Sequence, residues 1–157
     1  MGRWHYSEDW QTELKTASCA YRCHYHLVFS TKYRSKVLSP EMAAVIAETL
    51  LSLQEERAFH LLGLYVGDDH VHILFSLAPK ESLADFIKLA KGRTAKVLRE
   101  RFESLRKLPS LWTSGYWVES LGAKSLWQMK AYLDKQGEHH GKWATGKQLS
   151  PTEVGAQ

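Results

Sequence analysis

The sequence predicts an α+β domain with a ferredoxin-like fold, in which the elements follow in the order βαββαβ and one helix is added at the C-terminal end. Three observations predict this class. Four segments are rich in aromatic and β-branched residues, as strands are. Two long segments between them repeat apolar residues at helical spacing. A turn sequence, Gly67-Asp68-Asp69, joins the two middle strands. In this topology the first and third strands lie side by side at the centre of the sheet.

The first half of the predicted domain is a strand, a helix and a hairpin. The strand spans residues 21–30, where aromatic and β-branched residues alternate with polar ones. The helix spans residues 39–59, because Ser39 is a suitable N-cap, Pro40 fits the first turn and apolar residues recur at helical spacing. The hairpin covers residues 60–77. These elements supply the first three strands of the sheet.

The second half of the predicted domain is a helix, a strand and a last helix. The helix covers residues 82–102, with Ser82 as its N-cap and an apolar stripe facing the core. The fourth strand is expected within residues 111–122, and the last helix within residues 123–140, ending near Gly137. Trp112, Tyr116 and Trp117 belong to the fourth strand and favour core or dimer packing, with base stacking as the alternative.

Length and composition favour one soluble domain. The chain has 157 residues, enough to bury a core without disulfides, and a net charge of +4 that permits binding to a polyanion. No stretch approaches the roughly 20 apolar residues of a membrane span, and the N-terminal residues lack the apolar core of a secretory signal. We therefore expect a cytoplasmic protein without a membrane partner, with Cys19 and Cys23 as free thiols. Residues 1–20 are expected to be an N-terminal extension, 21–142 the domain and 143–157 a flexible tail.

Two histidine pairs lie on the predicted strands. His70 and His72 begin the second strand of the hairpin, and His24 and His26 have the same spacing in the first strand. Because side chains on a strand alternate between faces, each pair points to one face of the sheet. Two imidazoles on one face can bind a metal, or they can pack and hydrogen-bond as ordinary residues. Adjacent central strands can also bring all four imidazoles to one face, which leaves open a histidine-rich site with another metal preference.

The last predicted helix carries a tyrosine and a glutamine on one face. Tyr132 and Gln136 are four residues apart, so they lie one above the other. Leu126, Met129 and Leu133 form an adjacent apolar stripe that would dock the helix. This arrangement places Tyr132 and Gln136 beside the docked interface. A tyrosine on a helix can pack as an ordinary amphipathic residue, and it becomes a candidate nucleophile when it is joined to a histidine pair.

Taken together, these motifs resemble the HUH-type single-tyrosine transposases (TnpA) of small insertion sequences that move as single-stranded DNA. The resemblance runs from about Tyr21 to His139 and is carried by four stretches in the family's order: YHLVFSTKYRSKVL, DDHVHILF, LWTSGYWVESLG and YLDKQ. It implies that residues 21–142 form an HUH transposase domain with a ferredoxin-like fold. The implied activity is cleavage and rejoining of single-stranded DNA at insertion-sequence ends, through a 5′-phosphotyrosine intermediate, with recognition of terminal DNA hairpins.

The resemblance also implies roles for individual residues. By position, His70 and His72 match the metal-binding pair, Tyr132 the nucleophile and Gln136 the third metal ligand. The histidine pair of the first strand matches no ligand position and is expected to be structural or close to DNA. Imidazoles favour zinc or manganese, whereas the resemblance favours Mg²⁺ or Mn²⁺. It also implies a homodimer in which each subunit lends its tyrosine helix to the other's metal site.

Two further residues are expected to be accessory to this site. Asp69 directly precedes His70, so it can orient that imidazole or hold a metal-bound water, although an aspartate there can also simply close the turn. Lys135 lies three residues after Tyr132. It would be the catalytic partner if the chain followed the Tyr-x-x-Lys pattern of another HUH family.

Two basic clusters are candidates for DNA binding. The first directly follows the first strand and mixes an aromatic ring with cations, which suits phosphate contact and base stacking. The second forms one face of the second long helix, where an ordinary solvated face is the alternative. The two clusters are Lys32, Tyr33, Arg34 and Lys36, and Lys88, Lys91, Lys96 and Arg99.

Three rival functions remain open from the sequence. A rolling-circle replication initiator fits the Tyr-x-x-Lys pattern, although Gln136 and the short chain argue against it. A domesticated relative that cuts chromosomal palindromic repeats would carry the same motifs. A nonenzymatic RNA-binding module shares the sheet topology, but it would place aromatic patches on the central strands, where this chain has histidines.

Overall fold

The structure is a computed structural model that describes residues 3–6 and 13–140, with the backbone path alone for 3–6 and 132–140. The strands are β1 (Arg3–Tyr6), β2 (Leu14–Lys15), β3 (Ala20–Tyr21), β4 (His24–Ser30), β5 (Phe59–Val66), β6 (His70–Leu77) and β7 (Trp117–Leu121). The helices are α1 (Pro40–Leu53), α2 (Leu83–Arg101), α3 (Glu103–Arg106) and α4 (Ala123–His140), with a 3-10 turn, η1 (Lys32–Arg34). From β4 to α4 the main elements follow the predicted order.

The main sheet has five antiparallel strands in the order β1-β5-β6-β4-β7. Strands β5, β6, β4 and β7 have the ferredoxin-like arrangement, with β4 and β6 as the adjacent central pair, so the predicted fold class is confirmed. Strand β1, which pairs with β5 at the sheet edge, and the small sheet formed by β2 and β3 are not predicted from the sequence. Strands of four and two residues are too short to show an alternating pattern.

The register of β4 against β6 decides which residues share a face. Val28 lies opposite His72, and His26 lies opposite Leu74. Because facing residues point to the same side of a sheet, both histidine pairs project from one face. The other face carries the apolar residues of the two strands, including Leu27 and Ile73, which are fully buried in the core.

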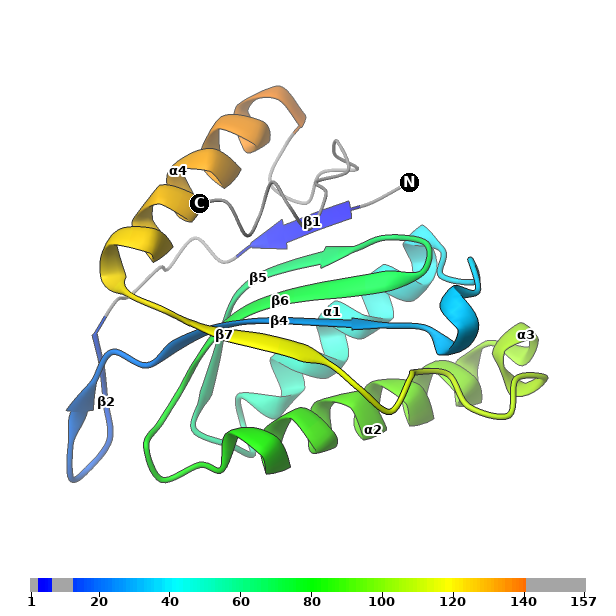
Figure 1. Ribbon diagram of the computed structural model, residues 1–157, viewed down its shortest axis with the longest axis horizontal. Helices are drawn as coiled ribbons and strands as arrows, with labels where there is room; N and C mark the ends of the chain where they lie inside the picture. Colours follow the sequence, from blue (N-terminus) through cyan, green and yellow to red (C-terminus); the bar gives the residue numbers. More distant parts are fainter. Residues whose placement is uncertain (1–2, 7–12, 141–157) are drawn as a thin grey trace.

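Helices α1 and α2 cover the apolar face, and their predicted caps are confirmed (Figure 1). Ser39 accepts a hydrogen bond from the backbone N–H of Met42, and Ser82 accepts one from the N–H of Asp85. Such caps satisfy N–H groups that a helix leaves without partners in its first turn. The two helices therefore begin where the sequence predicts, and their apolar stripes complete the core with the sheet.

Four predicted boundaries differ from the structure. The strand predicted for residues 21–30 begins at His24, because Tyr21 pairs with Leu14 in the small sheet instead. The helix predicted for residues 39–59 ends at Leu53, because the chain turns there and the Gln54 side chain accepts the backbone N–H of Leu61 at 2.7 Å. The strand predicted within residues 111–122 is confined to β7, and Trp112 before it makes only an isolated bridge. Helix α4 continues to His140, past the glycine near which it was expected to end.

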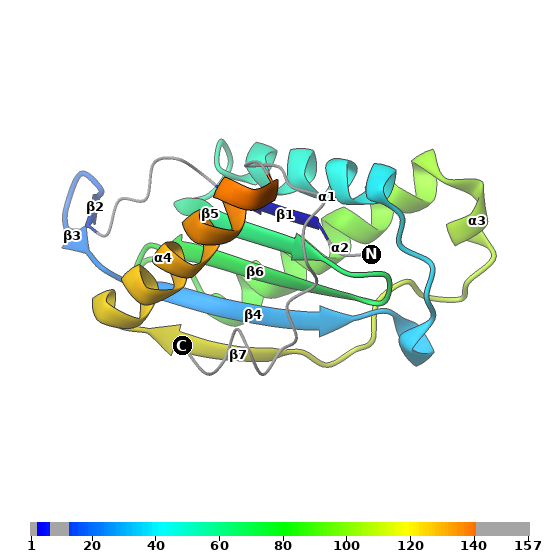
Figure 2. The same ribbon diagram turned by 90° about the horizontal axis from the view of Figure 1, so that it is seen from above.

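Helix α4 lies across the histidine face of the sheet, on the side opposite α1 and α2 (Figure 2). Leu126 and Met129 are buried, as expected for the stripe that docks this helix, whereas the side chain of Leu133 lies outside the described residues. Among the described residues, no helix combines the length and apolarity that crossing a bilayer requires. The sheet thus carries a closed apolar layer on one face and a histidine cluster beneath a single helix on the other.

Candidate metal centre

The histidine face holds four buried imidazoles from β4 and β6. The rings of His26 and His72 are stacked, with centroids 5.2 Å apart, and the ring of His70 lies edge-on to that of His72 at the same distance. His24 lies farther along β4, opposite Ser76, and its Nδ1 is 2.7 Å from the hydroxyl of that serine. The structure therefore joins three of the four imidazoles into one cluster.

His70 is held by the aspartate that precedes it. Its Nδ1 lies 2.7 Å from Oδ1 of Asp69, whose other oxygen accepts a hydrogen bond from Nε of Arg34 at 3.1 Å. Burial raises the pKa of Asp69, but hydrogen bonds from His70 and Arg34 outweigh it and hold that pKa below its usual value. An ionised carboxylate accepts only, so Nδ1 of His70 carries the proton and Nε2 keeps its lone pair.

Both HxH imidazoles present a buried nitrogen without a hydrogen-bonding partner among the described residues. These atoms are Nε2 of His70 and Nε2 of His72. A buried polar atom without a partner is uncommon and calls for an explanation such as a bound ion. Two imidazole nitrogens suit a divalent cation, so the residues fit the expected metal. Within the described part of the chain, no group of three or more His, Cys, Asp or Glu could hold a metal ion by itself, and the histidine pair supplies two nitrogens.

Burial keeps His26 and His72 neutral near pH 7. It lowers the pKa of His26 to about 4. Burial, together with the nearby His26 and His70, lowers the pKa of His72 to about 3. Imidazole must be unprotonated to bind a metal, so at neutral pH protons compete little with a cation for His72. At neutral pH His72 is therefore in the unprotonated form that a metal ligand requires.

The expected nucleophile and third ligand lie on α4. Tyr132, Lys135 and Gln136 all fall within this helix, and Tyr132 and Gln136 share a face because they are four residues apart. Their side chains lie outside the described residues. Helix α4 nevertheless crosses the sheet face from which the imidazoles project (Figure 2).

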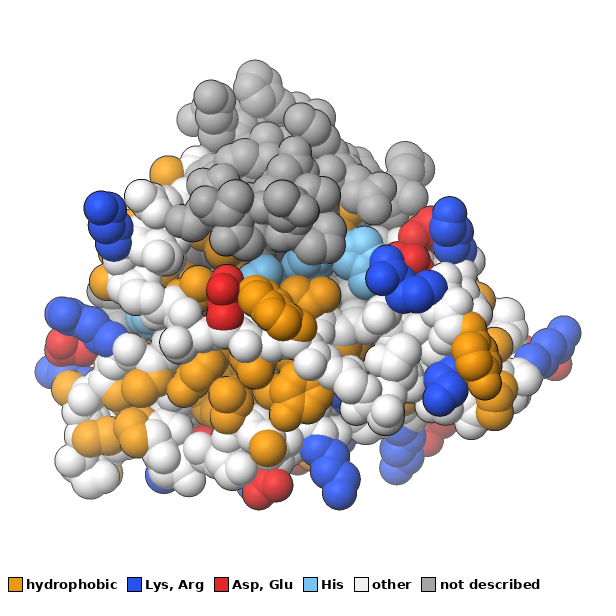
Figure 3. All heavy atoms as spheres, in the orientation of Figure 1, with side chains coloured by type: hydrophobic (Ala, Val, Ile, Leu, Met, Phe, Trp, Pro, Cys, Tyr) orange, Lys and Arg blue, Asp and Glu red, His pale blue; other side chains and the backbone are white. Residues whose placement is uncertain are grey.

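The first basic cluster lies beside the histidines. Backbone hydrogen bonds join Thr31 to Asp69 and Leu38 to Asp68, so the η1 turn is fastened to the β5–β6 hairpin. Tyr33 and Arg34 both have positive φ, at 59° and 54°, which is a costly conformation for residues other than glycine. Figure 3 shows histidine atoms at the surface of this face with Lys or Arg side chains next to them.

Tyr33, in the first cluster, is the most exposed large hydrophobic residue among the described residues. It is 81% exposed, and Nζ of Lys32 lies 5.6 Å from the centre of its ring. Lys36 lies two residues beyond η1 and is exposed. The strained turn therefore presents an aromatic ring and cations to solvent next to His70.

The second basic cluster lies on α2, across the sheet from the histidines. Lys88 and Lys96 are exposed, whereas Nζ of Lys91 donates to the backbone carbonyls of Thr113 and Gly115 at 2.7 and 3.0 Å. Burial lowers the pKa of Lys91, and the contacts tie α2 to the loop before β7. The structure does not bring this cluster together with the imidazoles.

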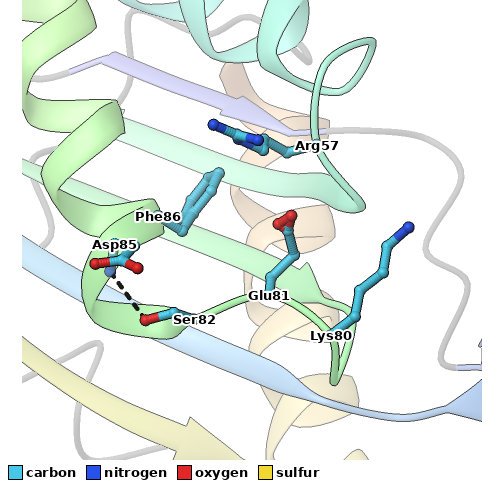
Figure 4. Close-up of a pocket in the computed structure, with 6 residues that line it drawn as sticks. All are labelled: Arg57, Lys80, Glu81, Ser82, Asp85 and Phe86. Atoms are coloured by element: carbon cyan, nitrogen blue, oxygen red, sulfur yellow. Dashed lines mark hydrogen bonds between the residues drawn. The ribbon is translucent and has the colours of Figure 1, made fainter.

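Two surface hollows lie away from the histidine face. One, of about 530 Å³, is lined by Lys96, Arg99, Glu100 and Arg106 and places two residues of the second cluster in a basic concavity. The other, of about 290 Å³, lies where β6 leads into α2, at the end of β6 opposite His70 (Figure 4). Its lining residues are Arg57, Lys80, Glu81, Ser82, Asp85 and Phe86. Neither hollow includes a residue of the histidine cluster.

Two contacts at the site were missed from the sequence. Arg34 was considered only for DNA binding, yet it also holds Asp69. Glu119 was assigned no role, yet its Oε1 lies 3.5 Å from Nδ1 of His26. The register of β7 against β4, which places Glu119 opposite His26, is the signal that reveals the second contact. Alternation along a strand gives the shared face, but it does not give the register between strands.

Comparison with known proteins agrees with this fold. The family described as "Transposase IS200 like" matches residues 19–136. The transposase for insertion sequence element IS200 of Salmonella typhimurium is 30% identical over 141 residues, which cover 88% of this chain and 90% of the relative. The ISDra2 transposase TnpA of Deinococcus radiodurans is 28% identical over 119 residues, covering 74% and 85%.

Solved structures show the same likeness. A crystal structure of a Deinococcus radiodurans R1 protein, named as a transposase, has 31% identity and a TM-score of 0.63, covering 78% of this chain and 97% of that chain. A REP-associated tyrosine transposase bound to a REP hairpin has a TM-score of 0.54 and 14% identity, covering 86% and 75%, and shows the fold alone.

The fold, the paired histidines and these matches define a class of protein: a transposase, an enzyme that processes DNA. This chain belongs to the IS200-like transposase family.

Proposed function

We propose that this transposase cleaves and rejoins single-stranded DNA at insertion-sequence ends, with Tyr132 as the nucleophile. The observation that carries the proposal is the pair of buried Nε2 atoms, on His70 and His72, which lack partners among the described residues. They lie on the sheet face that α4 crosses. A metal-binding pair beneath a helix with a tyrosine suits phosphodiester chemistry.

The proposed metal ligands are Nε2 of His70, Nε2 of His72 and the side-chain oxygen of Gln136, with Mg²⁺ or Mn²⁺ as the ion. When bound, the ion polarises the scissile phosphate and offsets the negative charge that develops on its oxygens. Asp69 fixes the orientation of His70 through the 2.7 Å contact. With three proposed protein ligands, the ion would keep further coordination positions open for phosphate oxygens of DNA.

In the proposed reaction, the scissile phosphate exchanges its bond to a DNA oxygen for a bond to the phenolic oxygen of Tyr132. The phenolic oxygen loses its proton and bonds to phosphorus, and the bond from phosphorus to the 3′ oxygen of the preceding nucleotide breaks. That oxygen takes up a proton and leaves as a 3′-hydroxyl. A free tyrosine has a pKa near 10, so its proton must be removed as it attacks. Attack by a 3′-hydroxyl on the phosphotyrosine ester reverses the step, so rejoining needs no ATP.

The DNA strand at the cleavage point is proposed to meet the first basic cluster, Lys32, Tyr33, Arg34 and Lys36. Its position next to His70 and the exposure of Tyr33 support a role in phosphate contact and base stacking. The second cluster, Lys88, Lys91, Lys96 and Arg99, is proposed to contact a hairpin stem farther from the reacting phosphate. A hairpin partner is also supported by the family match and by the fold neighbour that is bound to a REP hairpin.

The proposed place of action is the cytoplasm, where DNA is available. The proposed assembly is a homodimer in which the two subunits exchange their tyrosine helices. Strand β7 lies at an edge of the sheet and leads into α4 through Gly122. Tyr116 and Trp117, just before and within β7, are half exposed. Exposed aromatic residues at a strand edge support a subunit interface, and the glycine supports a change in the path of α4.

Formation of a covalent protein–DNA adduct tests the proposal. Purified protein is incubated with 5′- and 3′-labelled single-stranded DNA hairpins and Mn²⁺ or Mg²⁺, and adducts are separated on denaturing gels. The wild type should retain the label on the 3′ side of the cut, and Tyr132→Phe should lose the adduct while it keeps hairpin binding. Tyr21→Phe, in the small sheet formed by β2 and β3, is the matched control and should keep both. An undiminished adduct in Tyr132→Phe would assign the nucleophile to another residue, and binding to RNA hairpins without any adduct would favour the nonenzymatic alternative.

A further inference from the structure

His26 and Glu119, which no motif of the family assigns, are linked to the metal-binding pair by direct contacts. Nε2 of His26 lies 2.9 Å from Nδ1 of His72, and Nδ1 of His26 lies 3.5 Å from Oε1 of Glu119. The first distance is that of a hydrogen bond, and the second is slightly longer than one. The three side chains thus form a row that runs from the edge strand β7 through β4 to β6.

Only one proton can lie between His26 and His72, so the contact has two arrangements. If Nε2 of His26 carries the proton, Nδ1 of His26 turns a lone pair toward the carboxylate of Glu119. In that case Nε2–H of His72 is also buried without an acceptor among the described residues. Both consequences are unfavourable, because a lone pair faces an acceptor and a donor stays unpaired.

The other arrangement avoids both conflicts, although the 3.5 Å approach of His26 Nδ1 to Glu119 is too long to count as a hydrogen bond. Nδ1–H of His72 donates to Nε2 of His26, and Nδ1–H of His26 points toward Oε1 of Glu119. Nε2 of His72 then keeps its lone pair, as a metal ligand requires. His70 reaches the same state through Asp69. In both imidazoles of the pair, Nδ1 carries the proton and Nε2 is free to bind a metal. The partner of Nδ1 is Asp69 for His70 and His26 for His72.

We infer that His26 and Glu119 are positioning residues that fix the tautomer and the ring orientation of His72 for metal binding. The inference rests on the proposed metal site and extends it, because the first-strand histidine acts through His72 and is not itself a ligand. His26 is 1% exposed and stacks on His72, and the ring of Trp117 meets it edge-on at 5.3 Å. These contacts hold the His26 ring in place, so the orientation it imposes on His72 is also fixed.

The neighbouring histidine of β4 offers a matched control. His24 is buried on the same face, but its Nδ1 contacts Ser76 and no contact joins its ring to His72 in the described structure. His26→Phe removes the acceptor for Nδ1–H of His72, whereas His26→Gln can keep an acceptor oxygen there. His24→Phe makes the same change in size and polarity two residues away.

The first measurement is the affinity of the metal-free full chain for Mn²⁺, obtained by titration calorimetry. His26→Phe should weaken binding by about 10- to 100-fold, as loss of an outer partner of a ligand does. His26→Gln should recover most of that loss, and His24→Phe should stay within about twofold of the wild type. Wild-type affinity in His26→Phe would overturn the inference and leave the proposed function standing. Failure of the wild type to bind Mn²⁺ would overturn both.

The second measurement does not depend on a variant that must fold. Long-range ¹⁵N–¹H NMR of the metal-free wild type reports which ring nitrogen of each histidine carries the proton. His26 and His72 should both be Nδ1–H tautomers. An Nε2–H signal from His72 would overturn the inference whatever the metal affinity.

Glu119→Leu, at a partly exposed position, should weaken Mn²⁺ binding by about 3- to 10-fold, and unchanged binding would remove Glu119 from the row.

Discussion

Gly67 lies against the ring of His70, and replacing it with alanine is a targeted perturbation of the proposed metal site. A Cβ atom at this position would lie 2.6 Å from Cε1, 2.9 Å from Nδ1 and 3.2 Å from Nε2 of His70. Carbon atoms in good contact are about 3.5–4.0 Å apart, so the ring must move by roughly 1 Å. The backbone of Gly67 is not in the left-handed region, so the added methyl group is the whole perturbation.

A shift of this size exceeds what the site tolerates. Metal–ligand distances hold within about 0.2 Å of their usual values, and the 2.7 Å contact between His70 and Asp69 would stretch or break. We expect Gly67→Ala to weaken Mn²⁺ binding by about 10- to 100-fold, as loss of a ligand's outer partner does. The free energy of unfolding should fall by about 1–3 kcal/mol, the usual cost of overpacking.

Calorimetry with Mn²⁺ and urea unfolding measure the two effects. Gly92→Ala is the control, because nothing lies within 4 Å of its added methyl group. It should leave Mn²⁺ binding unchanged and add up to about 1 kcal/mol of stability, since alanine favours the helix. In a His70→Ala background, Gly67→Ala should cost almost nothing, because the ring it displaces is absent. An unchanged Mn²⁺ affinity, or the same stability loss with and without His70, would refute this reasoning.

Three further predictions concern stability and DNA affinity. In the folded protein the pKa of His26 is about 4 and that of His72 is about 3, whereas both are expected near 6.5 in the unfolded chain. The stability that these two neutral histidines contribute is therefore complete above about pH 6.5 and is lost as the pH falls. Between pH 7.5 and 5.5 the two residues together should remove about 3 kcal/mol from the free energy of unfolding, measured with urea. Trp112→Phe loses the 3.1 Å hydrogen bond from Nε1 to the hydroxyl of Thr94 and should cost about 1–3 kcal/mol in the same assay. Lys96→Ala should weaken hairpin binding about equally for all sequences and lower its salt dependence by about one unit of slope, measured by fluorescence anisotropy.

Each of these has a control or an outcome that contradicts it. The pH dependence should flatten when both histidines are replaced by glutamine, and an unchanged slope would assign it to other groups. Trp127→Phe changes a half-exposed tryptophan, so an equal loss there would show that the buried hydrogen bond of Trp112 is not the cause. A loss of binding by Lys96→Ala for one hairpin sequence alone would point to base recognition and not to a phosphate contact.

The sequence predicts the fold and the shared face of His70 and His72 because these signals are local. Alternation places His70 and His72 on one face, and Ser39 and Ser82 are recognisable caps. The central pairing of β4 and β6 follows from the ferredoxin-like order. Strand β1 is not predicted, because it forms by pairing with β5, which lies far away in the sequence.

The contacts around the pair could not be predicted, because they depend on register and side-chain orientation. The sequence offers two HxH motifs, and only the β4–β6 register shows that His26 meets His72 whereas His24 meets Ser76. The approach of Glu119 depends in the same way on the register of β7. The residue roles that came from family resemblance, those of Tyr132 and Gln136 above all, remain predictions.

Identification of the residue that becomes linked to DNA tests the central claim most directly. The adduct formed with a single-stranded hairpin and Mn²⁺ is digested with nuclease and trypsin, and the modified peptide is sequenced by mass spectrometry. Cleavage after Lys130 and Lys135 releases residues 131–135, AYLDK. A nucleotide phosphate on Tyr132 in this peptide is the predicted result. Its presence on another residue, such as Tyr33 or Tyr116, would contradict the claim that α4 supplies the nucleophile.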